Sequence, residues 1–354
     1  MKKIVLSAFL IIILSVTQTV SAQYRDIIVH DPVMIEHDGM YYIFNTDFGL
    51  KMWSSPDLDN WTDEGAIFPE APEWTFDVNP DFKNHMWAPD ITYHNGKFYL
   101  FYSVSAFGRN TSAIAVATNT TLDTDSPDYK WVDHGPVIRS VPGRDMWNAI
   151  DPNLAFDDEG HPWLTFGSFW MGIKIVRLDD SLTKVYEPQT WRTIAARHRD
   201  WKVDERDAGD AANPELNYAE LYSEDQLEAN QTMQNGAIEA PFIFKKNGYY
   251  YLLFSWDRCC KGLESSYKTV VGRAKNVMGP YVDKAGNKLI HGGGTVIASE
   301  TDRWAAVGHP AAYTFDGVDF LVAHAYDKND DGKPKLILAE ITWDENGWPS
   351  VELN

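Results

Sequence analysis

The amino-acid sequence predicts an all-β protein folded as a five-bladed β-propeller. The first observation is a hairpin pattern that occurs five times: a proline, a short apolar strand, a glycine seven or eight residues after the proline, and an aromatic-rich strand. The second is that successive prolines of this pattern lie 57 to 89 residues apart, which is typical of a repeat architecture. The third is that further short strands, rather than helices, follow each hairpin, and four strands per unit make a propeller blade.

Residues 1–22 are predicted to be a secretory signal peptide that is removed after Ala22. This segment carries Lys2 and Lys3, then an apolar run, then small residues before the expected cleavage site. Residues 23–354 are predicted to form a single propeller domain that carries the active site. No later segment is apolar and long enough to span a bilayer, so we expect an exported protein, periplasmic or extracellular, with no membrane partner.

The charge of the chain argues against anionic partners. The full sequence has a formal net charge of −20, and loss of the two lysines of the leader makes it −22. Nucleic acid and anionic membranes would repel such a protein, so we expect a neutral ligand and no nucleic acid.

Each hairpin is followed by a segment that is typical of two outer strands. The five hairpins are predicted at residues 30–46, 88–104, 150–168, 239–256 and 308–326. Their outer strands are predicted within or after residues 52–65, 115–135, 173–187, 269–283 and 336–350. A polar, charge-dense insertion at residues 192–235 separates the third unit from the fourth. It is either a lid or cleft wall beside the site or a solvated surface excursion, and the sequence leaves both open.

The only two cysteines of the chain, Cys259 and Cys260, are adjacent. Neighbouring Cα atoms lie about 3.8 Å apart, which is short for a disulfide. An exported protein nevertheless meets an oxidising compartment, and neither thiol has another partner in the chain. We therefore predict a vicinal disulfide, with two free buried thiols as the alternative.

The residues before the five prolines are predicted to meet around one axis, because the first strand of every propeller blade lines the central channel. They are Asp31, Ala88, Asp151, Ala240 and His309, with Asp90 and Glu239 one residue from that level. Crowded, buried carboxylates acquire different pKa values, which lets one act as a base and another as an acid. The alternative is that each carboxylate only caps backbone N–H groups at a turn. Three carboxylates in register favour a catalytic site.

Six motifs occur in order along the chain: H-D-P at 30–32, W-A-P-D at 87–90, N-A-I-D-P at 148–152, G-S-F-W-x-G at 167–172, A-I-E-A-P at 237–241 and the run 257–281 around the cysteine pair. With these motifs the chain resembles glycoside hydrolase family 43, and within it the endo-1,5-α-L-arabinanases. The resemblance covers residues 24–354. It implies that Asp31 is the general base, Glu239 the general acid, and Asp151 the group that adjusts the pKa and orientation of Glu239. It also implies inversion of configuration, for which base and acid stand about 6.5 to 9.5 Å apart.

Further contacts with a sugar chain are expected around these carboxylates. The candidates are Trp87, Phe169 and Trp170 for stacking on sugar rings and Asp90, Asn148 and Ser168 for polar contacts. Each of the six side chains could equally serve blade packing.

The resemblance further implies a metal ion on the propeller axis, with His309 as a ligand. We expect no cofactor to be needed for the chemistry and a structural calcium ion at most, although calcium prefers oxygen ligands. A second calcium motif is not expected. Residues 327–332 read DKNDDG, like the start of an EF-hand loop, but Leu338 stands where that loop requires a glutamate, so we predict a hairpin turn.

The expected function is an exported, monomeric glycoside hydrolase that cleaves internal α-1,5 bonds of arabinan and arabino-oligosaccharides with inversion. The alternatives within the family are an exo-acting arabinanase, an α-L-arabinofuranosidase and a β-xylosidase. An alternative of another class is a non-catalytic carbohydrate-binding propeller, which would need no acid and base. Asp31, Asp151 and Glu239 together weigh against that last possibility.

Overall fold

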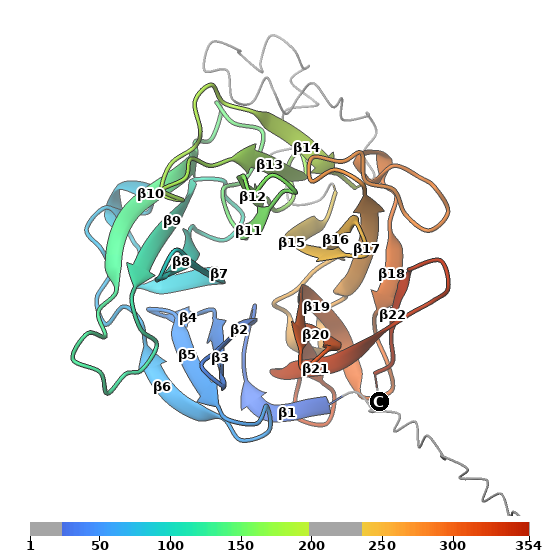
Figure 1. Ribbon diagram of the computed structural model, residues 1–354, viewed down its shortest axis with the longest axis horizontal. Helices are drawn as coiled ribbons and strands as arrows, with labels where there is room; N and C mark the ends of the chain where they lie inside the picture. Colours follow the sequence, from blue (N-terminus) through green and yellow to red (C-terminus); the bar gives the residue numbers. More distant parts are fainter. Residues whose placement is uncertain (1–22, 198–235, 354) are drawn as a thin grey trace, which may run out of the picture.

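The computed structural model describes residues 23–197 and 236–353. Within them, five β-sheets are arranged around a central axis, as Figure 1 shows in a view down that axis. The predicted five-bladed, all-β propeller is therefore confirmed. The expected signal peptide and most of the insertion at 192–235 lie outside the described residues.

The blades follow one another in chain order, and each has four strands or more. Blade 1 consists of β2 (Val33–His37), β3 (Met40–Asn45), β5 (Lys51–Ser55) and β6 (Thr62–Ala66). Blade 2 consists of β7 (His85–His94), β8 (Lys97–Val104), β9 (Ser112–Asn119) and β10 (Val132–Ser140), with β4 (Asp47–Phe48) beside β7. Blade 3 consists of β11 (Asn153–Phe156), β12 (Pro162–Phe166), β13 (Ile173–Arg177) and β14 (Trp191–Ala195). Blade 4 consists of β15 (Ile238–Lys246), β16 (Tyr249–Trp256), β17 (Lys268–Ala274) and β18 (Thr295–Ala298).

Blade 5 is closed by the N-terminal end of the chain, which the repeat pattern did not predict. It consists of β19 (Trp304–Phe315), β20 (Val318–Asp327) and β21 (Lys333–Trp343), and both β1 (Gln23–Ile28) and β22 (Pro349–Val351) pair with β21. Because β1 comes before blade 1 and pairs with blade 5, it joins the two ends of the ring (Figure 1). Residues 327–332 form the predicted turn between β20 and β21.

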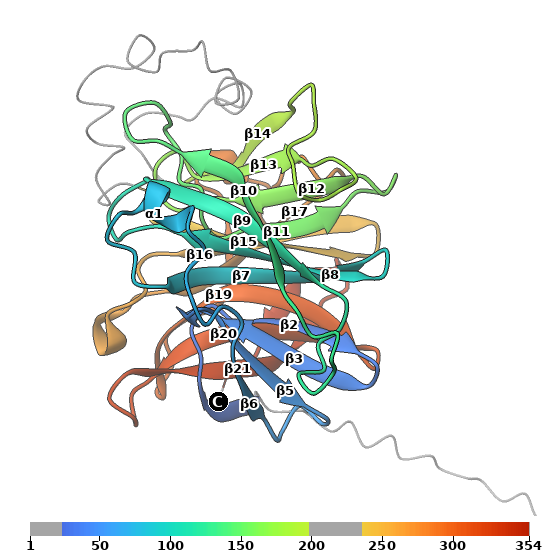
Figure 2. The same cartoon turned by 90° about the vertical axis from the view of Figure 1, so that its left-hand side faces the viewer.

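The helical content of the described residues is small and leaves the blades uncovered. It comprises α1 (Thr75–Val78) and the 3₁₀ turns η1 (Gly262–Glu264) and η2 (Leu289–His291). Figure 2 shows α1 at the rim of the propeller. None of these segments has the length and apolar character of a membrane-spanning helix. The apolar core lies between neighbouring sheets, where the faces of adjacent blades pack together.

The turns of the inner hairpins have the backbone that their sequences predict. In blade 1, Asp38 and Gly39 have φ of 52° and 76°, and in blade 2, Asn95 and Gly96 have 49° and 79°. Two consecutive positive φ values define the type I′ turn, whose twist matches that of the flanking strands. Blades 4 and 5 have the same pair of positive φ values, so the turn places the glycine in four of the five inner hairpins and explains its seven-residue spacing from the proline; in blade 3 only Gly160 has a positive φ, and the spacing there is eight.

The residue before each of the five prolines also has a positive φ, although none of these residues is glycine. The five are Asp31 (53°), Ala88 (44°), Asp151 (58°), Ala240 (58°) and His309 (51°). Such a backbone costs about 1 kcal/mol or more for a residue with a side chain, and it persists only where surrounding contacts determine it. In this protein the preceding blade supplies that contact. An atom of that blade accepts a hydrogen bond from the backbone amide of each of the five residues.

In four cases the acceptor is a side chain at the end of the second strand of the preceding blade. Thr46 Oγ1 accepts from Ala88, Ser103 Oγ from Asp151, Ser255 Oγ from His309, and His324 Nδ1 from Asp31, at 2.7, 3.1, 2.8 and 3.1 Å. The last of these joins blade 5 to blade 1 and so closes the circle. We call the five amide hydrogen bonds the inter-blade ring.

The fifth member of the inter-blade ring is different, because the matching position in blade 3 is Gly167. The Gly167 amide bonds to Ile150 in the same way that the Thr46 amide bonds to His30. Since glycine has no side chain, it cannot accept a hydrogen bond from the next blade. The carboxylate of Asp151 takes this role, and its Oδ2 lies 3.1 Å from the amide of Ala240.

The disulfide between Cys259 and Cys260 is present, with an S–S distance of 2.07 Å. The predicted vicinal bridge is therefore confirmed. It lies in the segment between β16 and β17, one blade before the closure of the ring.

We predict that Ser255→Ala destabilises the propeller by about 1 to 3 kcal/mol. The substitution leaves the amide of His309 buried without its acceptor, and an unsatisfied buried donor costs that much. Urea unfolding monitored by tryptophan fluorescence measures the change in free energy of unfolding. Ser181→Ala, at an exposed serine of blade 3, is the matched control and should change stability by less than about 0.5 kcal/mol. Equal stabilities of the two variants would contradict a structural role for the inter-blade ring.

Candidate active site

Asp31 lies at the axis, directly before β2, and its carboxylate is surrounded by hydrogen-bond donors. Thr46 donates to Oδ2 at 2.6 Å, and the Nδ1 atoms of His30 and His309 lie 3.0 and 2.9 Å from Oδ1. Because Thr46 Oγ1 accepts the Ala88 amide, its own proton is directed at Asp31. Burial would raise the pKa of Asp31, but His30 and His309 outweigh it and hold that pKa well below its ordinary value. Asp31 is thus ionised at neutral pH, as a general base must be.

Glu239 lies in β15, and its surroundings shift its pKa in the opposite direction from that of Asp31. Ser168 donates to Oε2 at 2.5 Å, and the hydroxyl of Tyr267 donates to Oε1. Burial is the largest influence on its pKa and raises it, while these two hydroxyls partly oppose the change. The net result is a raised pKa, which favours the protonated form that a general acid needs.

Asp151 links these two groups through the backbone. By accepting the amide of Ala240, it fixes the residue that follows Glu239. Burial raises the pKa of Asp151 well above its ordinary value; His309 opposes this effect, and the charge of Glu239 adds to it. The hydrogen bond agrees with the expected orienting role of Asp151, while its effect on the pKa of Glu239 stays a prediction.

His309 completes the group at the axis. Burial alone would lower its pKa, but the carboxylates of Asp31, Asp151 and Glu239 outweigh burial and raise the pKa of His309 to about 9. The imidazolium therefore balances part of the negative charge of the site. All four side chains are buried, with 6 to 9 % of each residue exposed. The arrangement holds one ionised carboxylate beside carboxyl groups of raised pKa, which is the requirement for acid–base catalysis.

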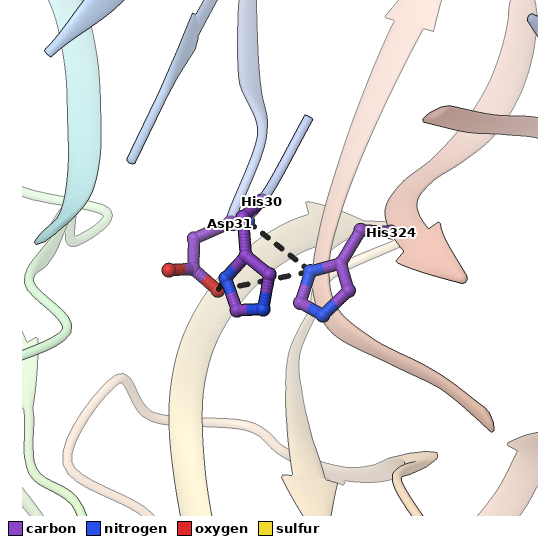
Figure 3. Close-up of side chains that lie close together, drawn as sticks. All are labelled: His30, Asp31 and His324. Atoms are coloured by element: carbon purple, nitrogen blue, oxygen red, sulfur yellow. Dashed lines mark hydrogen bonds and ion pairs between the residues drawn. The ribbon is translucent and has the colours of Figure 1, made fainter. Parts of the chain in front are cut away.

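The described residues do not form a calcium cage at this position. His30, Asp31 and His324 are close enough together to be metal ligands, and Figure 3 shows how they face one another. The ring nitrogens of the two histidines already make hydrogen bonds, however. Asp31 N–H donates to His324 Nδ1, and the Nε2 atoms of His30 and His324 lie 2.8 and 3.2 Å from Tyr326 Oη. His309 offers one ring nitrogen away from Asp31, and calcium prefers oxygen. The expected ion at His309 stays a prediction, and no step of the chemistry depends on it.

The expected sugar contacts in the loop after β12 lie around Glu239. Ser168 holds the carboxyl group of Glu239, as described above. Phe169 and Trp170 are 3 and 4 % exposed, and the Phe169 amide bonds to the Ile238 carbonyl at 2.8 Å. The structure therefore places this loop against the inner strand that carries the acid. A direct contact of Phe169 or Trp170 with substrate stays a prediction.

The other three expected contacts lie in blade 2 and at the start of blade 3. Asp90 is buried and accepts from Asn153 Nδ2 at 3.1 Å and from the Leu154 amide at 2.7 Å, so its carboxylate connects the inner strands of the two blades. Burial raises the pKa of Asp90 to about 7. Asn148 accepts from Ser112 at 2.6 Å, and the half-buried Trp87 ring packs edge-on against Phe107, which is 69 % exposed. Their substrate contacts also stay predictions.

Sequence reasoning missed five side chains that hold the two catalytic candidates. They are His30, Thr46, Tyr267, His324 and Tyr326. A signal for two of them existed, since Thr46 and His324 each follow the inner-strand proline of their repeat by fourteen residues, as Ser103 and Ser255 do in theirs.

Comparison with known proteins identifies the family of the chain. The model of the family described as "Glycosyl hydrolases family 43" matches residues 26–349. The chain belongs to that family. The predicted resemblance is thereby confirmed at the level of the family, and this family 43 protein is a glycosidase.

Two curated proteins and one solved structure are similar to this protein over almost the whole chain. The extracellular exo-α-(1→5)-L-arabinofuranosidase ArbA of Cellvibrio japonicus is 46 % identical over 93 % of this chain and 87 % of its own length. The extracellular endo-α-(1→5)-L-arabinanase 1 of Bacillus subtilis is 39 % identical over 91 % of this chain and 87 % of its own. The structure of the Cellvibrio cellulosa α-L-arabinanase in complex with arabinohexaose has a TM-score of 0.83 at 45 % identity and covers 92 % of this chain and 96 % of that one.

We predict that Asp31→Asn and Glu239→Gln each reduce kcat on linear arabinan by at least about 100-fold, because positioned acids and bases contribute that much. Both amides preserve the size of the side chain, so circular dichroism and thermal unfolding should still report a folded propeller. Asp316→Asn, in the exposed turn of blade 5, is the matched control and should retain normal turnover. Normal turnover in either purified active-site variant would refute its assignment.

We predict that Tyr267→Phe shifts the alkaline limb of the activity profile to higher pH by about half a unit to one unit. The Tyr267 hydroxyl lowers the pKa of Glu239, so its removal raises that pKa. A general acid with a higher pKa keeps its proton to higher pH, and activity is then lost later as pH rises. Measuring kcat/KM from pH 4 to 10 tests this, and a shift to lower pH would contradict the proposed hydrogen bond.

Proposed function

We propose that this protein hydrolyses the α-1,5-L-arabinofuranosidic bonds of arabinan with inversion of configuration. The observation that carries the proposal is the pairing, in one buried group, of Asp31 held ionised and Glu239 with a raised pKa. In the proposed reaction Asp31 removes a proton from a water molecule, which attacks the anomeric carbon. Glu239 donates its proton to the leaving oxygen on the opposite side. Asp151 keeps the strand that carries Glu239 in register through the Ala240 amide.

Arabinan is the proposed substrate because the names of the relatives share the α-(1→5)-L-arabinosyl linkage. One curated relative is named an exo-α-(1→5)-L-arabinofuranosidase and the other an endo-α-(1→5)-L-arabinanase, and an arabinanase structure of the same fold contains arabinohexaose. Both relatives are also named extracellular, which supports export of this protein. We further propose that it acts as a monomer, on arabinan and arabino-oligosaccharides.

A polar cavity lined by Tyr267, and not by Asp31, Asp151 or Glu239, is a proposed binding surface for a hydroxyl-rich chain one residue away from the acid. It has a volume of about 630 Å³ and lies between the start of β17 and the segment before β19. Ser265, Ser299 and Thr301 contribute hydroxyls to it, and Lys268 and Lys328 contribute ammonium groups. Hydroxyls and charged groups of this kind bind neutral sugars through hydrogen bonds.

The endo mode is our first proposal, and exo action is the second candidate. The relative that is 46 % identical is named an exo enzyme, whereas the one that is 39 % identical is named an endo enzyme. An endo enzyme needs a cleft that is open at both ends, and an exo enzyme needs one that is blocked. The segments around the inner strands decide this difference, since they carry the variable parts of the binding surface.

We predict that digestion of linear 1,5-α-arabinan gives a ladder of oligosaccharides from the first minutes, with negligible release of 4-nitrophenol from aryl α-L-arabinofuranoside or β-xyloside. Chromatography of the early products and NMR of the first reducing ends measure mode and inversion together. One small product from the start would establish exo action instead. Cleavage of aryl glycosides without arabinan would indicate an arabinofuranosidase or xylosidase, and sugar binding without hydrolysis would indicate a non-catalytic propeller.

A further inference from the structure

The segment that carries the vicinal disulfide reaches the catalytic group. The backbone amide of Cys260 donates to Tyr326 Oη at 2.7 Å. The Cys259 side chain packs against a buried cluster of Tyr267, Tyr326, Ala305 and Ala306. One of these tyrosines bonds to Glu239 and the other to the histidines beside Asp31. Tyr267 therefore separates the disulfide from Glu239, and Tyr326 and His30 separate it from Asp31. Cys260 Sγ also lies 3.8 Å from His30 Nε2.

Tyr326 connects the disulfide to two histidines. Its Oη lies 2.8 Å from His30 Nε2 and 3.2 Å from His324 Nε2, and the residue is only 2 % exposed. The two imidazole rings are stacked, with centroids 4.0 Å apart. At the far side of His30, Nδ1 lies 3.0 Å from Asp31 Oδ1. Figure 3 shows His30 and His324 converging on Asp31 from the two ends of the ring of blades.

Two backbone amides determine where each proton lies in this series of hydrogen bonds, because a backbone N–H can only donate. The amide of Asp31 donates to His324 Nδ1, so that nitrogen carries no proton. Burial lowers the pKa of His324 well below its ordinary value, so the ring is neutral and its proton is on Nε2. His324 Nε2–H therefore donates to Tyr326 Oη.

The amide of Cys260 is the second fixed donor, and it also donates to Tyr326 Oη. A phenol oxygen accepts two hydrogen bonds, so both lone pairs are occupied and the phenol proton must be donated elsewhere. Its remaining contacts are the Ser265 side chain and His30 Nε2; Ser265 lowers the pKa of Tyr326, as a hydrogen-bond donor does, so His30 Nε2, at 2.8 Å, is the acceptor for the phenol proton. His30 then accepts at Nε2 and carries its proton on Nδ1, where it donates to Asp31.

We propose that the Cys259–Cys260 disulfide and Tyr326 are positioning residues for the general base: they fix the tautomer of His30 so that its Nδ1–H points at the Asp31 carboxylate. Without the Cys260 amide, Tyr326 can turn its proton away from His30. His30 Nε2 then loses its donor, and the other tautomer, with a bare Nδ1 facing the carboxylate, becomes accessible. Asp31 would lose one of the donors that orient it toward water. The inference rests on the proposed role of Asp31.

The local backbone explains why a bridge is needed at this position. Cys260 has φ of 68°, in the left-handed region that residues with side chains rarely adopt. The following residues are held by Lys261 N–H to Ser265 Oγ at 3.0 Å and by Ser266 N–H to the Arg258 carbonyl at 2.8 Å. These bonds fix the two ends of the turn, and the disulfide fixes the two cysteines relative to each other. Together they direct the Cys260 amide at Tyr326.

The first test is Tyr326→Phe, which keeps the packing of the ring and removes the phenol. We expect kcat on arabinan to fall about ten-fold, with KM changed less than two-fold, because the variant changes the base and not the binding of substrate. Nitrogen NMR of the protein labelled with ¹⁵N-histidine should show His30 in the Nδ1–H form in the parent and a shift toward Nε2–H in the variant. His30→Gln identifies the resonance.

The matched control is Tyr281→Phe. Tyr281 is also a fully buried tyrosine whose hydroxyl makes one hydrogen bond, to the Val277 carbonyl at 2.8 Å, in the outer part of blade 4. Its loss should lower stability to a similar extent without changing kcat or the His30 signal. Equal effects of the two variants on kcat would reduce Tyr326 to a structural residue and overturn the proposal.

The second test asks whether the disulfide acts through Tyr326. Cys259→Ser with Cys260→Ser, and the parent treated with a water-soluble phosphine, should both lower kcat and shift the His30 signal in the same direction as Tyr326→Phe. Neither change should lower kcat further in the Tyr326→Phe protein. Additive losses would show an independent, structural effect of the bridge, and a raised KM with unchanged kcat would show that the segment binds substrate instead.

The NMR measurement separates this inference from the proposed function. If Asp31 is not the base, the His30 signal still responds to Tyr326→Phe and to loss of the disulfide, while kcat does not. If the tautomer assignment is wrong, the His30 signal stays unchanged in every variant, whatever the enzyme hydrolyses.

Discussion

The structure depends on one constraint: five buried backbone amides at the propeller axis must each find an acceptor in the neighbouring blade. The amides belong to residues with positive φ directly before a proline, so they cannot join the hydrogen bonds of their own sheet. An unsatisfied buried amide costs about 1 to 3 kcal/mol, and five of them would offset much of the stability of a typical domain. The inter-blade ring meets this requirement and sets the position of each inner strand relative to the next.

The same hydrogen bonds also position the chemistry. Thr46 accepts from blade 2 and thereby directs its proton at Asp31. His324 accepts from blade 1 and thereby takes the tautomer that faces Tyr326. Asp151 accepts from blade 4 because Gly167 cannot, and it thereby fixes the strand of Glu239. Closure of the propeller and orientation of the candidate catalytic groups are two results of one set of contacts.

The electrostatics of the site follow from which carboxylate receives histidine partners. Asp31 is surrounded by His30, His309 and the Thr46 hydroxyl, so its ionised form is favoured despite burial. Glu239 has two neutral hydroxyls, which compensate less of the cost of burying a charge. Two carboxyl groups of similar intrinsic acidity therefore have pKa values shifted in opposite directions within one site.

The sequence by itself determined the features that local patterns encode. The proline-to-glycine spacing predicted the hairpins, and their repetition predicted five blades. The geometry of a propeller then predicted that Asp31, Asp151 and His309 lie at one level of the axis. Only the tertiary structure decided the rest, because those contacts join residues far apart in the chain. The pairing of β1 with β21, the choice of Thr46, His324 and Asp151 as acceptors, and the contact of Cys260 with Tyr326 all lie between different blades or across the ring closure. A hairpin's sequence specifies its own turn and strands, whereas the direction of a hydrogen bond between blades exists only once the sheets have packed around the axis.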